Sequence, residues 1–253
     1  MISPTHDPIR IVPLHVPDEV TQLTAAPIPP PQLTYRGGHL LTAIEVYTVF
    51  WGAAWEQAPQ SGLMTSLNQF FDFVLTSPLM DQLAEYSVPG LAIGHGKRTG
   101  TTVLKATAVP HSVRDHQLQQ LLQKETAAGG KLPAPTPQTL YFIYLPPGVV
   151  VTQGGGRSCM TFCGYHSDIG GNLFYAVMPY PGCAGCTGGL QPLDALTSTS
   201  SHELCEAVTD PVPGQGWYDD QHGENGDICA WKTGQLGNYK VQLEWSNRAG
   251  ACV

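Results

Sequence analysis

The sequence has few charged residues, and basic residues are the scarcest of them. Only 13% of its 253 residues are charged, and 12 Lys and Arg against 20 Asp and Glu give a formal charge of −8. This balance disfavours nucleic acid or an anionic membrane as the main partner, because both attract basic proteins. No run approaches the roughly 18 apolar residues of a membrane span, so we expect none. The first residues also lack the basic-then-apolar form of a signal peptide.

Two catalytic signatures are missing as well. The run Gly154-Gly155-Gly156 is not followed by the Gly-Lys-Ser/Thr of a phosphate-binding loop, so we expect a flexible loop there. No Gly-x-Ser-x-Gly elbow occurs, and no Cys/His pairing stands out, which disfavours a serine or cysteine nucleophile.

No cysteine precedes Cys159, but seven follow from there to Cys252. This usage, with 28 Gly and 22 Pro, predicts a secreted protein whose C-terminal half is held by disulfides. An odd number leaves one thiol unpaired, and we expect it to be Cys205, while Cys229 and Cys252 form a pair. The other four are expected to make two disulfides, with an all-cysteine zinc site as the alternative. They are Cys159, Cys163, Cys183 and Cys186.

Proline divides the chain into two parts. Residues 1–32 are predicted to be a Pro-rich N-terminal arm, extended or disordered, and residues 33–253 a single domain. Residues 89–110 are expected to be irregular or weak strand. Hydrophobic periodicity predicts strands and helices in an α+β order. The strands are 44–51, 139–145 and 172–178, and the helices are 62–75, 78–86 and 113–125.

The most informative stretch contains His202, Glu203 and Glu206. His202 and Glu206 stand four residues apart and share one face of a helix, which is the HExxH geometry with Glu replacing the second His. Zinc accepts a carboxylate oxygen in place of an imidazole nitrogen. We therefore predict His202 and Glu206 as metal ligands, on the active-site helix of a zincin-like mixed sheet. Glu203 would be the general base that activates a metal-bound water.

A catalytic zinc usually has three protein ligands, so a third is needed. Asp227 and Glu224 are the leading candidates, because their Gly-rich turn can fold back onto the helix. Asp210 and His166 are further possibilities. Tyr218 is a possible stabiliser of the oxyanion, and so is a nearby histidine, although packing is the commoner role for either.

A calcium site is a competing prediction for the acidic turn, since hard oxygen ligands on a flexible loop suit that ion. The carboxylates concerned are Asp210, Asp219, Asp220, Glu224 and Asp227.

Several motifs in order resemble the EXORDIUM, or phosphate-induced protein 1, family. They include Tyr35-Arg36-Gly37-Gly38, Cys163-Gly164-Tyr165-His166-Ser167 and Val208-Thr209-Asp210-Pro211. The resemblance implies a similar fold and a secreted protein, as plant members are secreted to the cell wall space. It does not imply catalysis, because plant members generally have apolar residues at the positions of His202 and Glu203.

Two functions from different classes follow. The first is a secreted zinc-dependent metallopeptidase that hydrolyses a peptide or protein substrate. The alternative is a secreted, non-enzymatic cell-wall or protein-interaction module with a structural calcium site. The substitution Glu203→Gln separates them, because only an enzyme has turnover to lose.

Overall fold

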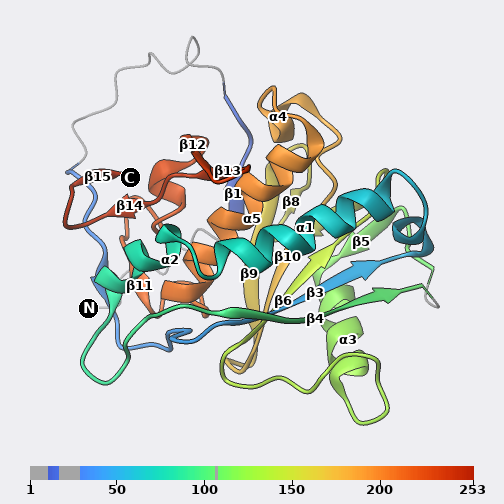
Figure 1. The fold of residues 1–253 in the computed structure, drawn as a ribbon, viewed down its shortest axis with the longest axis horizontal. Coiled ribbons are helices and arrows are strands. Elements are labelled where there is room, and N and C mark those ends of the chain that lie inside the picture. Colours follow the sequence, from blue (N-terminus) through green and yellow to red (C-terminus); the bar gives the residue numbers. More distant parts are fainter. Residues whose placement is uncertain (1–10, 17–28, 106–107) are drawn as a thin grey trace.

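The computed structural model describes residues 11–16, 29–105 and 108–253, which form an α+β fold around a six-stranded mixed sheet (Figure 1). The strand order is β1-β9-β10-β6-β3-β4. Strands β10, β6, β3 and β4 run parallel, whereas β9 and β1 are antiparallel to their neighbours. The bounds are β1 Ile11–Pro13, β3 Glu45–Trp51, β4 Lys97–Leu104, β6 Thr139–Tyr144, β9 Phe162–Ile169 and β10 Leu173–Met178.

The central strands are buried on both faces. Every residue of β6 and of β10 is buried, which explains why their sequences are nearly continuous apolar runs. Pairing of β3 with β6 runs in register from Glu45 opposite Thr139 to Phe50 opposite Tyr144. The strands predicted at 44–51, 139–145 and 172–178 are confirmed.

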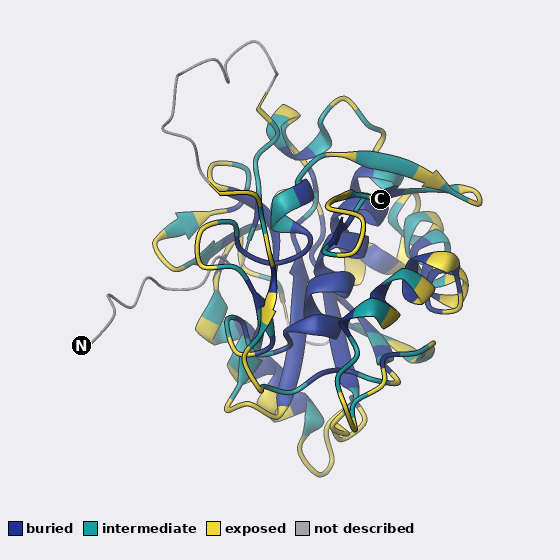
Figure 2. Cartoon of the chain, turned by 90° about the vertical axis from the view of Figure 1, so that its left-hand side faces the viewer, coloured by how far each residue is buried: buried dark blue, intermediate teal, exposed yellow. Residues whose placement is uncertain are grey.

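Helices cover both faces of this sheet. The helices are α1 Gln60–Val74, α2 Pro78–Leu83, α3 Asp115–Thr126, α4 Ala184–Thr187 and α5 Pro192–Thr209. Helices α1, α2 and α5 share an apolar core with one face, and α3 packs on the other. Figure 2 shows this central sheet and the helix across it in the colour of buried residues. The three predicted helices are confirmed, although α3 starts two residues late because 112–114 forms a strand.

Short elements connect the layers. The strands among them are β2 Thr34–Tyr35, β5 Ser112–Arg114, β7 Val150–Gln153, β8 Gly156–Arg157, β11 Trp217–Tyr218, β12 Thr233–Leu236, β13 Tyr239–Gln242, β14 Trp245–Ser246 and β15 Ala251–Cys252. The 3-10 helices are η2 Ala53–Glu56, η3 Ala84–Tyr86 and η4 Asp227–Cys229.

Two strands lie where the sequence predicts loop or weak structure. Strand β4 falls within 89–110, and its alternation of exposed and half-buried residues fits a sheet edge. Strand β9 falls in the Cys-rich stretch, and its residues Phe162 to Ser167 are buried. Because one face of β9 is polar although buried, its sequence resembles a loop.

One segment of the predicted N-terminal arm is extended and adds a strand to the main sheet. Strand β1 pairs with β9, and Pro13 O accepts a hydrogen bond of 2.8 Å from the Trp231 side chain. The backbone N–H of His15 donates to Gly185 O at 2.8 Å. The rest of the arm, 1–10 and 17–28, lies outside the described residues. No helix in the described ranges is long and apolar enough to cross a membrane.

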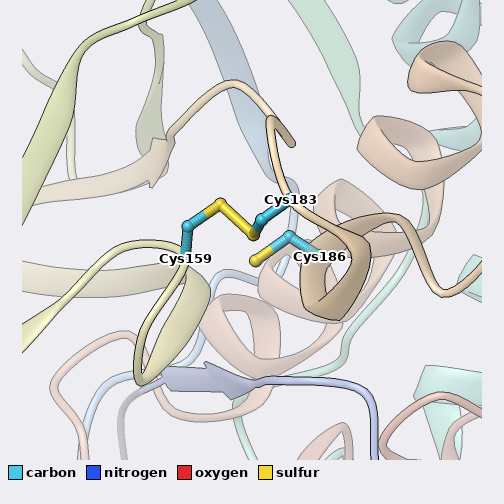
Figure 3. Close-up of side chains that lie close together, drawn as sticks. All are labelled: Cys159, Cys183 and Cys186. Atoms are coloured by element: carbon cyan, nitrogen blue, oxygen red, sulfur yellow. A yellow bond between two sulfur atoms is a disulfide. The ribbon is translucent and has the colours of Figure 1, made fainter.

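The disulfide predictions are confirmed. The pairs are Cys159–Cys183, Cys163–Cys186 and Cys229–Cys252, and Cys205 is free and buried. Figure 3 shows Cys159 bonded to Cys183, with the sulfur of Cys186 close by. Because these four cysteines are oxidised in two disulfides, their sulfur atoms do not form the alternative all-cysteine zinc site.

Candidate metal centre

Helix α5 carries the predicted motif into the interior. His202, Glu203 and Glu206 are fully buried, and every residue of the helix from Ala195 to Thr209 is buried. The helix ends at Thr209, just before the Asp-Pro pair, because a residue that precedes proline disfavours the helical conformation. A helix buried on all sides usually has an apolar sequence, so buried charge here requires partners from other elements.

Strand β9 supplies the nearest partner because it lies close to α5. A Cβ atom on Gly164 would lie 2.7 Å from Cγ2 of Thr199 and 3.4 Å from Oε1 of Glu203. A larger residue at this position would displace the Thr199 side chain, so the glycine allows the close contact of β9 with α5.

His166 follows Gly164 on the same face of β9 and contacts the motif directly. Its Nδ1 lies 3.0 Å from Oε2 of Glu203 and 3.4 Å from Oε2 of Glu206. Its Nε2 lies 3.2 Å from the carbonyl oxygen of Asp210 and 3.6 Å from Oε1 of Glu224. His166 is therefore an inner member of the cluster.

The acidic turn folds back onto α5, as the sequence predicts for Glu224 and Asp227. Nε2 of His202 lies 2.9 Å from Oε1 of Glu206 and 4.0 Å from Oδ1 of Asp227. The backbone N–H of Asp227 donates to Glu206 Oε1 at 3.0 Å. A Cβ atom on Gly226 would lie 2.8 Å from that oxygen, so the turn passes directly over the motif.

Two groups of side chains in this cluster could hold a metal ion. Within each, the ligand atoms lie within 4.8 Å of one another. One group is His202, Glu206 and Asp227, and the other is His166, Glu203 and Glu206.

Buried polar atoms without hydrogen bonds show that these groups fit a cation. Several lie in the cluster among the described residues: His202 Nε2, Glu203 Oε1, Glu206 Oε2, Asp227 Oδ1 and both carboxylate oxygens of Glu224. Such atoms are costly to bury unless something binds them. No Lys or Arg of the described ranges is buried, so no cationic side chain beyond the histidines neutralises the carboxylates.

In the metal-free protein, the histidines take the positive charge. Burial alone would lower the pKa of His166, but its hydrogen bond and charge interaction with Glu203, reinforced by Glu206, raise it to about 10. The pKa of His202 is likewise raised, by Glu206. Burial would raise the pKa of Glu206, but the charge of His202 and contact with His166 lower it to about 2. Burial raises the pKa of Glu203.

The other carboxylates are held nearer to their neutral form. Burial, followed by repulsion from Glu206, raises the pKa of Glu224 and of Asp227 well above the ordinary range. Burial also raises the pKa of Glu244.

The sequence did not predict two members of the cluster, Gln242 at the end of β13 and Glu244 just after it. The Gln242 side-chain nitrogen lies 2.8 Å from Nδ1 of His202 and 2.9 Å from the carbonyl oxygen of Gly226, and so fixes the imidazole. Glu244 is fully buried nearby and is close enough to affect the charge of His202. The only signal was Glu244 itself, a single acid between the apolar residues Leu243 and Trp245.

Two predicted participants lie elsewhere. The carboxylate of Asp210 accepts hydrogen bonds from the backbone N–H groups of residues 214–216, so it closes a loop and only its carbonyl reaches the cluster. Tyr218 packs under the guanidinium of Arg36, with 4.7 Å from Cζ to the ring centre.

The acidic turn does not gather its carboxylates into one calcium-like shell. Asp219 accepts hydrogen bonds from Gln32, Gln221 and His222. Asp220 forms an exposed ion pair with Arg36 at 2.7 Å. Only Glu224 and Asp227 of this turn join the buried cluster.

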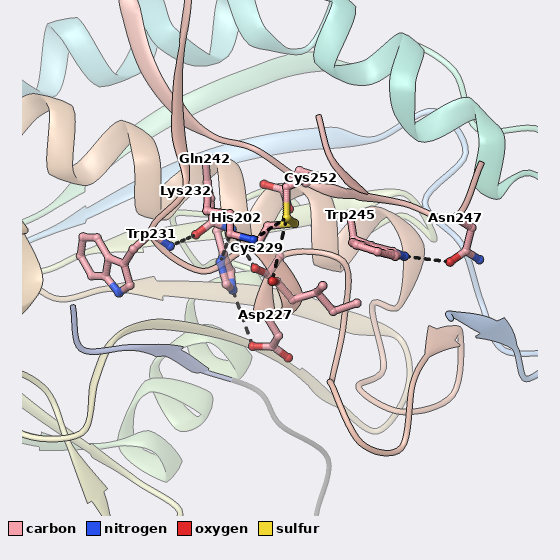
Figure 4. Close-up of a disulfide and its surroundings, with 12 residues drawn as sticks. His202, Asp227, Cys229, Trp231, Lys232, Gln242, Trp245, Asn247 and Cys252 are labelled. Carbon is pink, nitrogen blue, oxygen red and sulfur yellow. Dashed lines mark hydrogen bonds and ion pairs between the residues drawn. A yellow bond between two sulfur atoms is a disulfide. The ribbon is translucent and has the colours of Figure 1, made fainter. Parts of the chain in front are cut away.

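Disulfides hold the elements that carry the ligands. Cys229–Cys252 lies two residues beyond Asp227 and ties η4 to the C-terminus (Figure 4). Cys163–Cys186 ties β9, three residues before His166, to the helix that precedes α5.

The cluster is closed to solvent, with His166, His202, Glu203, Glu206 and Glu224 each at most 1% exposed. One surface hollow of about 500 Å³ lies elsewhere, lined by residues such as His39, Thr126, Asn172 and Phe174. Comparison with models of known protein families, with curated proteins and with solved structures finds no match to this chain.

Proposed function

We propose that this protein is a secreted, metal-dependent hydrolase that cleaves peptide bonds. His202, Glu206 and Asp227 would hold a zinc ion, which, when bound, lowers the pKa of water into the neutral range. Glu203 would be the general base, taking a proton through its carboxylate and later returning it to the leaving amine.

The observation that carries this proposal is the position of Glu203. It follows the first proposed ligand on α5, and His166 holds its Oε2 at 3.0 Å while Oε1 makes no hydrogen bond. A base needs one oxygen free to accept a proton and the other held in place. His166 thereby acts as a positioning residue for Glu203.

The arrangement of the sheet supports a zincin-like assignment. Helix α5 carries the motif across the sheet beside β9, and the acidic turn supplies a downstream carboxylate. We also propose that the chain is related to the EXORDIUM family. The three disulfides are compatible with an extracellular protein and with that relation.

The test compares Glu203→Gln with the wild type, using a library of quenched fluorescent peptides and protein loaded with one zinc ion per chain. Loss of a general base should lower kcat by about 10²–10⁴-fold while metal content and melting temperature stay close to wild type. Glu56→Gln, the same acid-to-amide exchange at an exposed ion pair with Lys105, is a control for unspecific effects. Peptide cleavage that is unchanged in Glu203→Gln would refute the role of Glu203.

A second function is favoured by one observation, the complete burial of the cluster. A structural metal centre is normally closed, whereas a catalytic one keeps an open position. If no peptide is cleaved although zinc or calcium binds and raises the melting temperature, the protein is better described as a secreted interaction module with a structural ion.

A peptidase must open before a substrate can enter, and β1 is the segment best placed to control this. It packs against α5 and η4, which both carry cluster residues. Removal of residues 1–16 should speed the extraction of bound metal by a chelator, and in an enzyme it should also raise activity. Equal extraction rates with and without the segment would show that β1 is not the cover.

A further inference from the structure

Glu206 faces two different imidazoles with its two oxygens. Oε1 lies 2.9 Å from Nε2 of His202, and Oε2 lies 3.4 Å from Nδ1 of His166. The two histidines come from separate elements, α5 and β9. A carboxylate placed between two nitrogen ligands in this way has the geometry of a bridging ligand.

The His166 side has the features of a metal site in its own right. Nε2 of His166 is within hydrogen-bond distance, 3.2 Å, of the carbonyl oxygen of Asp210. When Nε2–H donates to that carbonyl, the lone pair of the neutral ring lies on Nδ1, toward Glu203 and Glu206. Ligand imidazoles are usually held by such a hydrogen bond from the other nitrogen.

The unsatisfied oxygens call for more positive charge than one ion supplies. Three fully buried glutamates and an aspartate whose side chain is 5% exposed surround the histidines, and one dication balances only two of these four acids when all are ionised. On the His166 side, Oε1 of Glu203, Oε2 of Glu206 and both oxygens of Glu224 make no hydrogen bond. An ion at His202 alone would leave these atoms without a metal contact, and only the His166 ring would lie near them, 3.4 Å from Glu206 Oε2 and 3.6 Å from Glu224 Oε1. The four acids are Glu203, Glu206, Glu224 and Asp227.

We propose that the cluster holds two divalent cations bridged by Glu206. The first lies at His202 and Asp227, and the second at His166 and Glu203. Mixed imidazole and carboxylate ligands suit zinc, manganese or cobalt ions, and carboxylate-bridged pairs in enzymes lie about 3.5–4 Å apart. The proposal goes beyond the proposed function: it shares the ion at His202 with it but requires no peptidase activity.

The two proposals give Glu203 different roles. When the second ion is bound, Glu203 is its ligand and is not free to act as a base. The one-ion form would be the form in which Glu203 takes a proton. Activity measured against metal loading would therefore peak at one ion per chain if both proposals hold.

Metal counting tests the bridged pair. The full chain is stripped with a chelator, saturated with zinc, freed of loose metal by gel filtration and analysed for zinc and protein. We expect two ions per chain for the wild type and one each for His166→Asn and His202→Asn. His95→Asn, at an exposed histidine paired with Asp81, is the matched control and should keep two. Circular dichroism establishes that each variant is folded.

One ion per chain in the wild type, unchanged by His166→Asn, would overturn the proposal. If that variant does not fold, the wild type loaded with Mn²⁺ answers the question by electron paramagnetic resonance. An exchange-coupled pair signal supports the bridge, and only isolated-ion signals at saturation overturn it. Neither measurement uses a substrate, so a failed peptidase assay leaves the result unaffected.

Discussion

Helices α1 and α5 lie side by side on one face of the same sheet, but they bury opposite kinds of chemistry (Figure 1). α1 buries Leu67, Phe70, Phe71 and Val74, at the three- and four-residue spacing of an amphipathic helix. α5 buries two acids and a histidine in the same layer. The side chains buried on the two helices therefore differ in kind: those of α1 are apolar, and those of the motif on α5 are charged or polar.

The difference shows which parts of the protein depend on something outside the chain. Each buried apolar side chain of α1 contributes about 1.5–3 kcal/mol with no further partner. The charged side chains of α5 lose hydration on burial and recover it only through ion pairs, hydrogen bonds or a bound cation. The disulfides all lie in the C-terminal half, beside the costly region.

The largest expected effect comes from the removal of a buried apolar side chain from α1. Phe71→Ala should lower the free energy of unfolding by about 3–5 kcal/mol, because Phe71 is fully buried against Phe142. Metal content should not change. Phe73→Ala, on the same helix but 37% exposed, should cost much less. Urea unfolding of both variants measures the difference, and equal losses would contradict this account of α1.

Metal binding should stabilise the protein through the charged residues of α5 and not through the apolar residues of α1. Zinc at about 100 times its dissociation constant should raise the free energy of unfolding by about 2.7 kcal/mol for each ion that the wild type binds. In Glu206→Gln the gain should be lost, because this residue belongs to both metal groups. Glu56→Gln, at an exposed ion pair with Lys105, should keep the full gain. Thermal or urea unfolding with and without zinc provides the measurement.

Replacement of glycine by alanine should change the free energy of unfolding in opposite directions in the two regions. Gly226→Ala would bring a methyl group to 2.8 Å from Glu206 Oε1 and 2.9 Å from His202 Cγ, so it should cost about 1–3 kcal/mol and weaken zinc binding. Gly62→Ala lies in α1 with open space around it and should stabilise by about 0.5–1 kcal/mol. Unfolding curves of the two variants decide, and a stabilised Gly226→Ala would mean that the turn does not press on the motif.

The smallest expected effect is a dependence on pH that metal reverses. With the His166 pKa raised from 6.5 to about 10, its ion pairs stabilise the metal-free fold fully below pH 6.5, and this is lost as pH rises through 10. With the Glu206 pKa lowered from 4.5 to about 2, its contribution is present above pH 4.5 and is lost as pH falls through 2. For these groups the metal-free protein is most stable from pH 4.5 to 6.5.

Above pH 6.5 the stabilisation by zinc should increase as the stability of the metal-free protein falls, since bound imidazoles must be deprotonated. The melting temperature of the metal-free protein should fall from pH 6.5 upward, while the gain on adding zinc should grow. A melting temperature of the metal-free protein that rises over this range would contradict the charge assignment.

The sequence was most informative where packing alone decides the structure. The helix α1 and the strands β3 and β6 follow from apolar periodicity, and their burial needs no knowledge of other elements. The pairing of Cys229 with Cys252 and the free thiol of Cys205 were also predictable.

The cluster was predictable only where its residues form a local pattern. His202, Glu203 and Glu206 share a helix, and Glu224 and Asp227 share one turn. Strand β9 was missed because its polar face is buried only through contact with α5, which no local pattern reports. Gln242 was missed for the same reason, since a single amide in a short strand carries no periodic signal.

The pairing of β1 with β9 has a consequence for biosynthesis. Ile11 lies opposite Tyr165, so the earliest described strand of the chain has its partner in the second half. A ribosome adds about 5–20 residues per second, and the interval between the two strands is therefore on the order of ten seconds. During synthesis the sheet can grow from its parallel strands, but its N-terminal edge has to wait. The first described strand of the protein is thus among the last that can take its place.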